Sequence, residues 1–532
     1  MARLSHPPRL SHPPRLSHPP RLTFPELWAG LAILLPVLGS LLAPISTVDL
    51  AYHVRAGGIV LDSGALPSPD TFTWSAAGRP WLDQQWAAQV ALAALYRAGG
   101  WALVAVTRAA LVGLIAWLVL RACRSAGVAL RVAAWLTLGG FLVSLAALAM
   151  RPQLFGMVLF AAILAVLGER GRHPRLLWAI PSLVVLWANV HGSFVLGPAA
   201  LGAAWLFDVV NRRPGARRLF VLGVVSGLAT LVNPYGSGVW TYAVGLSANP
   251  VIRRLVSEWQ PTTPLSFGGA MFYGSVVAIV AGLIIAVVTA RRRVAGRYTS
   301  SGTIDPAAAA ADPTPDAAAT AADPRRPWPT LAWLLGLGLI GAFAERGVAW
   351  WAIAAPVALA GLLRPPLADR SAAASIGAPR ERPSATNTAI VVALGLLAVL
   401  LLPTWRGGDT LYGPPGLLTD APRGITTAVT SIARPTDRIW NAQRWGSWLE
   451  FALPGVPVAV DSRIELIPAE VWSDHLALSA GAPDWAAILD RRRITIVVAA
   501  ASEQRALLPL LRASPTWRLV HEDTDGAVFA RR

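Results

Sequence analysis

Long apolar runs, separated by short arginine-bearing connectors, fill the first 403 residues and limit the fold more than any other feature. The chain is 54% hydrophobic and only 14% charged, whereas a soluble protein carries about 25% charged residues. Runs of this length predict a polytopic helical membrane protein that resides in a lipid bilayer. We expect about eleven spans, at 27–45, 101–120, 132–150, 153–168, 176–190, 194–210, 218–233, 270–290, 329–344, 348–364 and 388–403.

Every second connector is rich in arginine, and this alternation predicts the orientation of the chain. The positive-inside rule places these connectors in the cytoplasm. With an arginine-bearing N-terminus on the same side, an odd number of spans puts the C-terminal tail outside. We therefore expect a multi-pass cell-membrane protein, N-terminus in and C-terminus out. The connectors carry Arg121, Arg124 and Arg131; Arg170, Arg172 and Arg175; Arg212, Arg213, Arg217 and Arg218; Arg291 to Arg293; and Arg364 to Arg382.

Three segments are predicted to be disordered. Residues 1–26 form a basic tail in which Arg-Leu-Ser-His-Pro-Pro occurs three times, and paired prolines at this period prevent a helix. Residues 295–328 and 365–387 have the composition of cytoplasmic linkers, rich in alanine and proline. The membrane domain is predicted to cover 27–403, with an outer loop at 46–100.

The tail, 404–532, is predicted to be a small soluble α/β domain outside the cytoplasm. Arginine and acidic residues are equal in number in this tail, so the net charge of +17 lies in the predicted membrane part. There the arginines cluster at the ends of the predicted spans. We therefore expect no nucleic-acid partner. Short apolar runs predict strands at 438–441, 456–460 and 494–499 and a hairpin at 517–522 and 527–531. Helical patterns lie between them, at 443–452, 468–480, 484–491 and 503–512, which gives a mainly α chain with one α/β layer.

Polar side chains gather on the predicted outer face, several of them at span edges. Ionisable groups at membrane depth are costly, so they usually face a cavity or a partner. We take this set as a candidate site. Its members are Asp49, His53, Asp83, Arg151, Asn189, His191, Glu258 and Arg346.

Each candidate also has a plain structural explanation. Asp49 and His53 are four residues apart, so on a helix they share a face and can act as catalytic base and partner, or simply close the first span as an ion pair. They also permit a divalent metal ion, although the metal-ligand spacing is incomplete. Arg151 and Arg346 suit a phosphate or snorkel to headgroups. His191 either binds substrate, a proton or a metal, or marks a helix break capped by Asn189.

The order of the short motifs resembles that of bacterial polytopic proteins related to the GT-C superfamily of membrane glycosyltransferases. The resemblance covers most of the chain from about residue 27. The motifs are Asp49-x-x-x-His53, Gly57-Gly58, Leu66 to Trp74, Gly78 to Asp83, Trp187 to Gly192, Asn233 to Gly236, Glu258-Trp259, Glu345 to Gly347, Trp445-Gly446 and Val460 to Arg463.

The resemblance implies transfer of a sugar from a polyprenyl-phosphate donor to an envelope glycan or lipid acceptor outside the cytoplasm. It matches Asp49 to the acidic catalytic position and Arg151 or Arg346 to the lipid phosphate. Asp83, Asn189, His191 and Glu258 are then expected to contact substrate. Two alternatives are a non-catalytic membrane scaffold, whose tail binds an envelope partner or glycan, and a transporter. The transporter is disfavoured because the two halves show no repeat.

Overall fold

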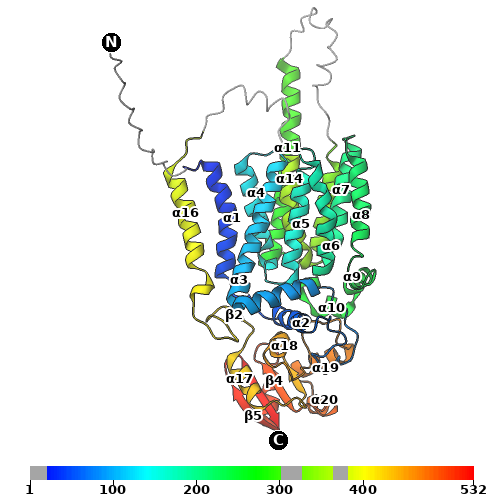
Figure 1. The fold of residues 1–532 in the computed structure, drawn as a ribbon, viewed down its shortest axis with the longest axis vertical. Helices are drawn as coiled ribbons and strands as arrows, with labels where there is room; N and C mark the ends of the chain where they lie inside the picture. The colour runs from blue at the N-terminus through cyan, green and yellow to red at the C-terminus, as the bar shows by residue number, and fades with distance from the viewer. Residues whose placement is uncertain (1–20, 301–325, 364–380) are drawn as a thin grey trace, which may run out of the picture.

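The computed structural model describes residues 21–300, 326–363 and 381–532. Most of the predicted N-terminal tail and of the two predicted linkers lies outside the described residues. The described chain is mainly helical, with a small sheet in the tail, and the tail lies against one end of a helix bundle (Figure 1).

Each predicted span overlaps a helix of the bundle. Within the described residues, five helical stretches are long and apolar enough to cross a membrane by length and composition, and several others are apolar but shorter. The number of crossings and their direction therefore stay predictions. The bundle helices are α1 (Phe24–Leu42), α3 (Trp86–Ser125), α4 (Leu130–Ser144), α5 (Pro152–Gly168), α6 (Ala179–Val190), α7 (Leu196–Val210), α8 (Ala216–Ala229), α11 (Phe267–Ser300), α13 (Trp328–Phe343), α14 (Val348–Leu362) and α16 (Ala385–Leu400).

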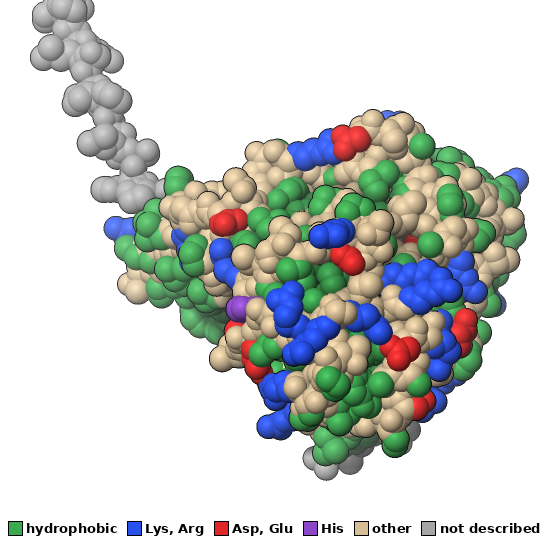
Figure 2. Space-filling view, turned by 90° about the horizontal axis from the view of Figure 1, so that it is seen from below, with side chains coloured by type: hydrophobic (Ala, Val, Ile, Leu, Met, Phe, Trp, Pro, Cys, Tyr) green, Lys and Arg blue, Asp and Glu red, His purple; other side chains and the backbone are tan. Residues whose placement is uncertain are grey.

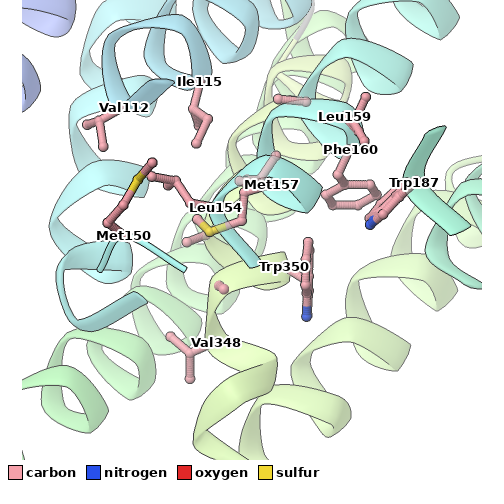
Figure 3. Packing of buried hydrophobic residues seen from close by; sticks show 14 of the residues in the cluster. Val112, Ile115, Met150, Leu154, Met157, Leu159, Phe160, Trp187, Val348 and Trp350 are labelled. Carbon is pink, nitrogen blue, oxygen red and sulfur yellow. The ribbon is translucent and has the colours of Figure 1, made fainter. Parts of the chain in front are cut away.

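The bundle core is built around the second half of α3, which packs against α1, α4, α5 and α14. Aromatic rings fill the space between α5, α6 and α14, where Phe160, Trp187 and Trp350 have centroids 5.8 to 6.0 Å apart (Figure 3). Such pairs add to the free energy gained by burial. This rigid cluster lies beside His191, whose ring centroid is 6.3 Å from that of Trp350.

The predicted outer loop 46–100 is largely helical. It contains α2 (Leu50–Ser63) and the first part of α3, which bends at Gly99 and Gly100. Gly100 has a φ of 60°, a conformation that glycine adopts without strain. These two helical segments lie between the bundle and the tail (Figure 1), so they join the helix bundle to the tail.

The tail holds a four-stranded sheet in the order β3-β4-β6-β5. β3 (Ile439–Asn441) and β4 (Ile496–Ala500) are parallel, and β6 (Gly526–Arg531) pairs antiparallel with β4 and with β5 (Trp517–Glu522). The predicted hairpin is confirmed. The helices of the tail are α17 (Arg423–Ile432), α18 (Gln443–Ala452), α19 (Ala469–Ser479), α20 (Trp485–Arg491) and α21 (Leu507–Ala513).

The strand predicted at 456–460 is wrong. Val458 makes only an isolated bridge with Thr73 of the outer loop. The segment is buried because it packs between the tail and that loop, so its apolar residues reflect burial rather than sheet pairing. A second short ladder pairs β1 (Ile45–Ser46), after the first helix, with β2 (Leu418–Thr419), before the tail domain.

The surface of the tail end mixes arginine and acidic side chains, as seen from below (Figure 2). Ion pairs of the tail include Arg492 with Asp474 at 2.7 Å and Arg531 with Asp490 at 2.7 Å. This agrees with the neutral charge balance of the sequence in this region.

Adjacent glycines in α2 give a direct test of how α2 meets α3. A Cβ at Gly57 would lie 2.0 Å from the carbonyl oxygen of Gln89, whereas a Cβ at Gly58 would be 3.6 Å from its nearest neighbour, the flexible Arg97 side chain. Gly57→Ala should therefore destabilise the protein by about 1–3 kcal/mol. Gly58→Ala, the matched control, should be neutral or stabilising by up to about 1 kcal/mol. Thermal unfolding of both purified variants measures this, and equal effects would contradict the close approach.

Candidate active site

A cavity of about 300 Å³ lies at the junction of the bundle, the outer-loop helices and the tail. Seven of the eight residues predicted for the site line it. These are Asp49, His53, Asp83, Arg151, His191, Glu258 and Arg346. Residues up to 297 positions apart in the chain thus share one space.

Arg151 forms the centre of the charged part of the cavity. It occupies the extended position before α5, and its Nε lies 3.2 Å from Asp49 Oδ2. Its Nη1 contacts Glu258, which lies in the short 3-10 turn η4 (Ser257–Trp259). The charge of Asp49, and then that of Glu258, raises the pKa of the Arg151 guanidinium, while burial opposes the rise. Arg151 is therefore a permanent cation between two carboxylates.

Arg346 lies in a turn that splits two helices, as the sequence predicted. The turn η5 (Glu345–Gly347) follows α13 and precedes α14. A Cβ at Gly347 would lie 2.5 Å from the Ile340 carbonyl oxygen, which explains the glycine in Glu345-Arg346-Gly347. The guanidinium lies 5.5 Å from the centroid of Trp259, and Nη2 is 3.2 Å from His191 Nε2.

The neutral imidazole ring of His191 contacts Arg346 and holds it in place. Burial, and then the charge of Arg346, lowers the pKa of His191 well below its ordinary value. The Arg346 guanidinium can only donate, and its Nη2 lies against Nε2 of the ring. On the other side of the ring, Nδ1 accepts from the Ser193 backbone N–H at 3.2 Å and lies 2.7 Å from Ser193 Oγ. Of the roles open to His191, this geometry favours positioning of Arg346.

His53 does not pair with Asp49. Asp49 precedes α2 and turns to Arg151, whereas His53 is buried, with Nδ1 3.2 Å from Gln89 Nε2. The same Gln89 nitrogen donates to Asp83 Oδ1 at 2.7 Å. Burial, and then Arg151, lowers the pKa of His53 well below its ordinary value. The alternative in which Asp49 and His53 form an ion pair at the end of the first span is therefore wrong. The Asp49 carboxylate pairs with the Arg151 guanidinium instead.

Asn189 does not line the cavity. Its Nδ2 donates to the carbonyl oxygens of Val185 and Val232, both at 2.8 Å, and its Oδ1 accepts from Trp86 Nε1 at 3.0 Å. Asn189 therefore joins the end of α6 to the end of α8 and the start of α3.

The donor set does not fit a divalent metal ion. The described residues contain no group of three or more His, Cys, Asp or Glu side chains suited to one. The position between Asp49 and Glu258 is occupied by the Arg151 guanidinium, which pairs with both carboxylates. His53 and Asp49, the pair that permitted a metal in the sequence, face different partners.

The tail supplies one wall of the cavity, and sequence reasoning missed it. Its lining residues are Gln443, Ser462, Arg463, Ile464 and Glu465. Glu465 Oε1 accepts from the Tyr242 hydroxyl of α9 (Gly238–Ala248) at 2.8 Å. The Asp461-Ser-Arg463 motif was the available signal, but nothing in the sequence showed that it meets residues 45–85.

Arg463 anchors this wall through a buried ion network. Its Nη1 lies 2.7 Å from Asp70 Oδ1 and its Nε lies 2.8 Å from Asp461 Oδ2, and all three residues are at most 2% exposed. The guanidinium also lies 4.5 Å from the Trp81 ring centroid. Burial raises the pKa of neighbouring Glu450 well above its ordinary value. The Arg463 guanidinium is therefore the counter-charge that Asp70 and Asp461 share inside the protein.

The fold is similar to that of a solved archaeal oligosaccharyltransferase of the GT-C type. The oligosaccharyltransferase of Archaeoglobus fulgidus in its apo form matches with a TM-score of 0.50 and 12% identity, over 96% of this chain and 74% of that protein. ArnT of Cupriavidus metallidurans bound to undecaprenyl phosphate matches with a TM-score of 0.46 and 16% identity, over 95% and 97%. At these identities the likeness concerns the fold alone. No family model matches the chain, and no curated protein matches its sequence significantly.

Removing the Arg463 cation tests the network. Arg463→Met leaves Asp70 and Asp461 buried without a counter-charge, which should cost about 3–5 kcal/mol. Arg444→Met is the matched control, because Arg444 pairs with Asp420 on the tail while 39% of its side chain is exposed. It should cost at most about 1 kcal/mol. Thermal unfolding compares the two, and similar losses would show that the Arg463 network is not a special anchor.

Asp83 provides a pH test. Burial raises its pKa to about 7, against about 3.9 in an unfolded chain. Between pH about 4 and about 7, Asp83 is therefore protonated in the folded state and ionised in the unfolded state. The stability contributed by this group falls as pH rises through this range. Asp83→Asn removes the titration. Its unfolding temperature relative to wild type should increase by at least about 2 °C across this window and level off above it. A difference independent of pH would contradict a buried, titrating Asp83.

Proposed function

We propose that the protein is a membrane glycosyltransferase that moves a sugar from a polyprenyl-phosphate donor to an envelope glycan or lipid acceptor outside the cytoplasm. The observation that carries this proposal is the convergence of two arginines and two carboxylates in one cavity at an end of the GT-C-like bundle. Arg151 and Arg346 suit the donor phosphate, and Asp49 and Glu258 suit proton transfer and charge balance.

Arg346 is the better phosphate ligand of the two arginines. It is held by the neutral His191 and by the face of Trp259, so none of its charge is cancelled by those partners. Arg151 shares its charge with Asp49 and Glu258. A guanidinium binds phosphate oxygens in a bidentate way, and a positive group is needed where negative charge develops on the leaving phosphate.

The prenyl chain requires an apolar path next to these arginines. A second cavity of about 220 Å³ is also lined by Arg151 and Arg346, and extends along the end of α4. Its apolar lining comprises Val143, Ala146, Ala147, Ala149 and Val348. We infer that the donor phosphate lies at the boundary of the two cavities, with the lipid in the second cavity and the sugar in the first.

The reaction follows from this placement. The acceptor hydroxyl oxygen attacks the anomeric carbon, and the bond from that carbon to the phosphate oxygen breaks. The phosphate leaves with the bonding electrons and is stabilised by Arg346 and Arg151. Asp49 takes the proton of the acceptor hydroxyl as general base, while Glu258 holds Arg151 in place. His53, through Gln89, supports the wall on which Asp83 lies.

Asp49→Asn tests the catalytic assignment. The change keeps the size of the side chain but removes the base, so sugar transfer should fall by about 10²-fold or more while the protein stays folded. The measurement is transfer of radiolabelled hexose or pentose from polyprenyl phosphate to envelope material, in membranes that contain the full-length protein.

Asp62→Asn is the control for Asp49→Asn. Asp62 lies in α2, the helix that Asp49 precedes, is exposed, and pairs with Arg97 outside the cavity. It should leave transfer unchanged. Transfer that is unaffected by Asp49→Asn would sink the catalytic role, and an absence of any transfer by wild type would favour the scaffold alternative.

A further inference from the structure

One edge of the cavity presents buried oxygen atoms without hydrogen-bond partners. Among the described residues, Asp83 Oδ2 and Gln84 Oε1 are both buried and unpaired, and both residues line the cavity. Asp83 is 3% exposed and Gln84 is 2% exposed. A buried acceptor without a donor costs about 1–3 kcal/mol, so two of them at one edge point to a ligand that supplies donors.

The other polar atoms of these two side chains form hydrogen bonds within the protein. Asp83 Oδ1 accepts from Gln89 Nε2 at 2.7 Å, and Gln84 Nε2 donates to the Ala188 carbonyl oxygen at 3.3 Å. Gln89 is itself held toward His53. The two side chains are thus fixed with one oxygen each left over. A Cβ at Gly192 would lie 3.0 Å from Gln84 Oε1, so a glycine there spares this oxygen a close neighbour.

We propose that Asp83 and Gln84 form a hydroxyl-binding subsite that takes the sugar ring of the lipid-linked donor. This inference rests on the proposed function and names the part of the cavity that distinguishes a glycosylated lipid from the bare lipid phosphate. Sugar hydroxyls donate to Gln84 Oε1 and to Oδ2 of the ionised Asp83 carboxylate. The phosphate arginines line the same cavity, so one sugar phosphate contacts both groups.

The cavity size agrees with this division. About 300 Å³ lies at the lower limit of small-ligand sites, which suits a sugar phosphate and excludes a folded prenyl chain beside it. Tyr242 and Glu465 already bond to each other on the tail side. The unpaired acceptors therefore belong to the edge formed by the outer loop.

Two substitutions separate the sugar from the phosphate. In Asp83→Asn, the amide oxygen must keep the place of Oδ1, because Gln89 Nε2 donates to it. An NH₂ group then takes the place of the acceptor Oδ2. Gln84→Met removes Oε1 at similar length. Binding is measured on the full-length protein in nanodiscs, with polyprenyl phosphate and with the same lipid carrying a hexose or a pentose. Asp62→Asn is the control.

We expect Asp83→Asn to weaken binding of the sugar-bearing lipid by about 10-fold and Gln84→Met by at least about 3-fold. Binding of bare polyprenyl phosphate should not change in either variant. If both lipids weaken alike, the effect is on the phosphate or the fold, and the subsite is overturned. If neither weakens, the edge holds the acceptor or water instead, which also overturns it. Wild type that binds neither lipid contradicts the proposed function itself.

Discussion

The rest of the site depends on one buried cation, Arg463, which lies between Asp70 of the outer loop and Asp461 of the tail. Neither carboxylate tolerates burial without this partner, so the loop and the tail must meet in a single arrangement. Arg55 of α2 adds a second link by donating to the Glu450 carbonyl oxygen at 2.7 Å. The cavity exists because these contacts place a soluble wall against the end of a helix bundle. A membrane domain and an α/β domain thereby form one site.

The polar groups of the cavity differ in which ion-pair or hydrogen-bond partners the protein gives them. Arg151 already has two anions, so its role is to hold Asp49 and Glu258 in fixed positions. Arg346 has a neutral ring and an aromatic face as partners, so it keeps charge for a ligand. Asp83 and Gln84 keep unpaired oxygens. In the proposed function, the positive charge for the phosphate and the acceptors for sugar hydroxyls are both in place before any ligand binds, which reduces the reorganisation that binding requires.

The sequence predicted features that depend on local pattern. The eleven apolar runs overlap eleven helices because burial in a bundle requires only a long apolar segment. The order of short motifs predicted a GT-C-like fold, and the likeness in fold to the oligosaccharyltransferase agrees with that prediction. Features set by long-range contacts were not predictable: Val456–Val460 is apolar because it lies under the outer loop, and Asp49 turns to Arg151 rather than to His53. The wall formed by Glu465 depends on the meeting of Asp70 with Arg463, 393 residues later.

The position of that wall in the chain has a consequence for biosynthesis. Arg463 and Glu465 are synthesised more than 300 residues after Asp49 and Arg151. A nascent chain can therefore assemble the early helices and still lack a closed cavity. In the proposed function, each copy stays inert until its tail has been synthesised and folded back onto residues 70–85.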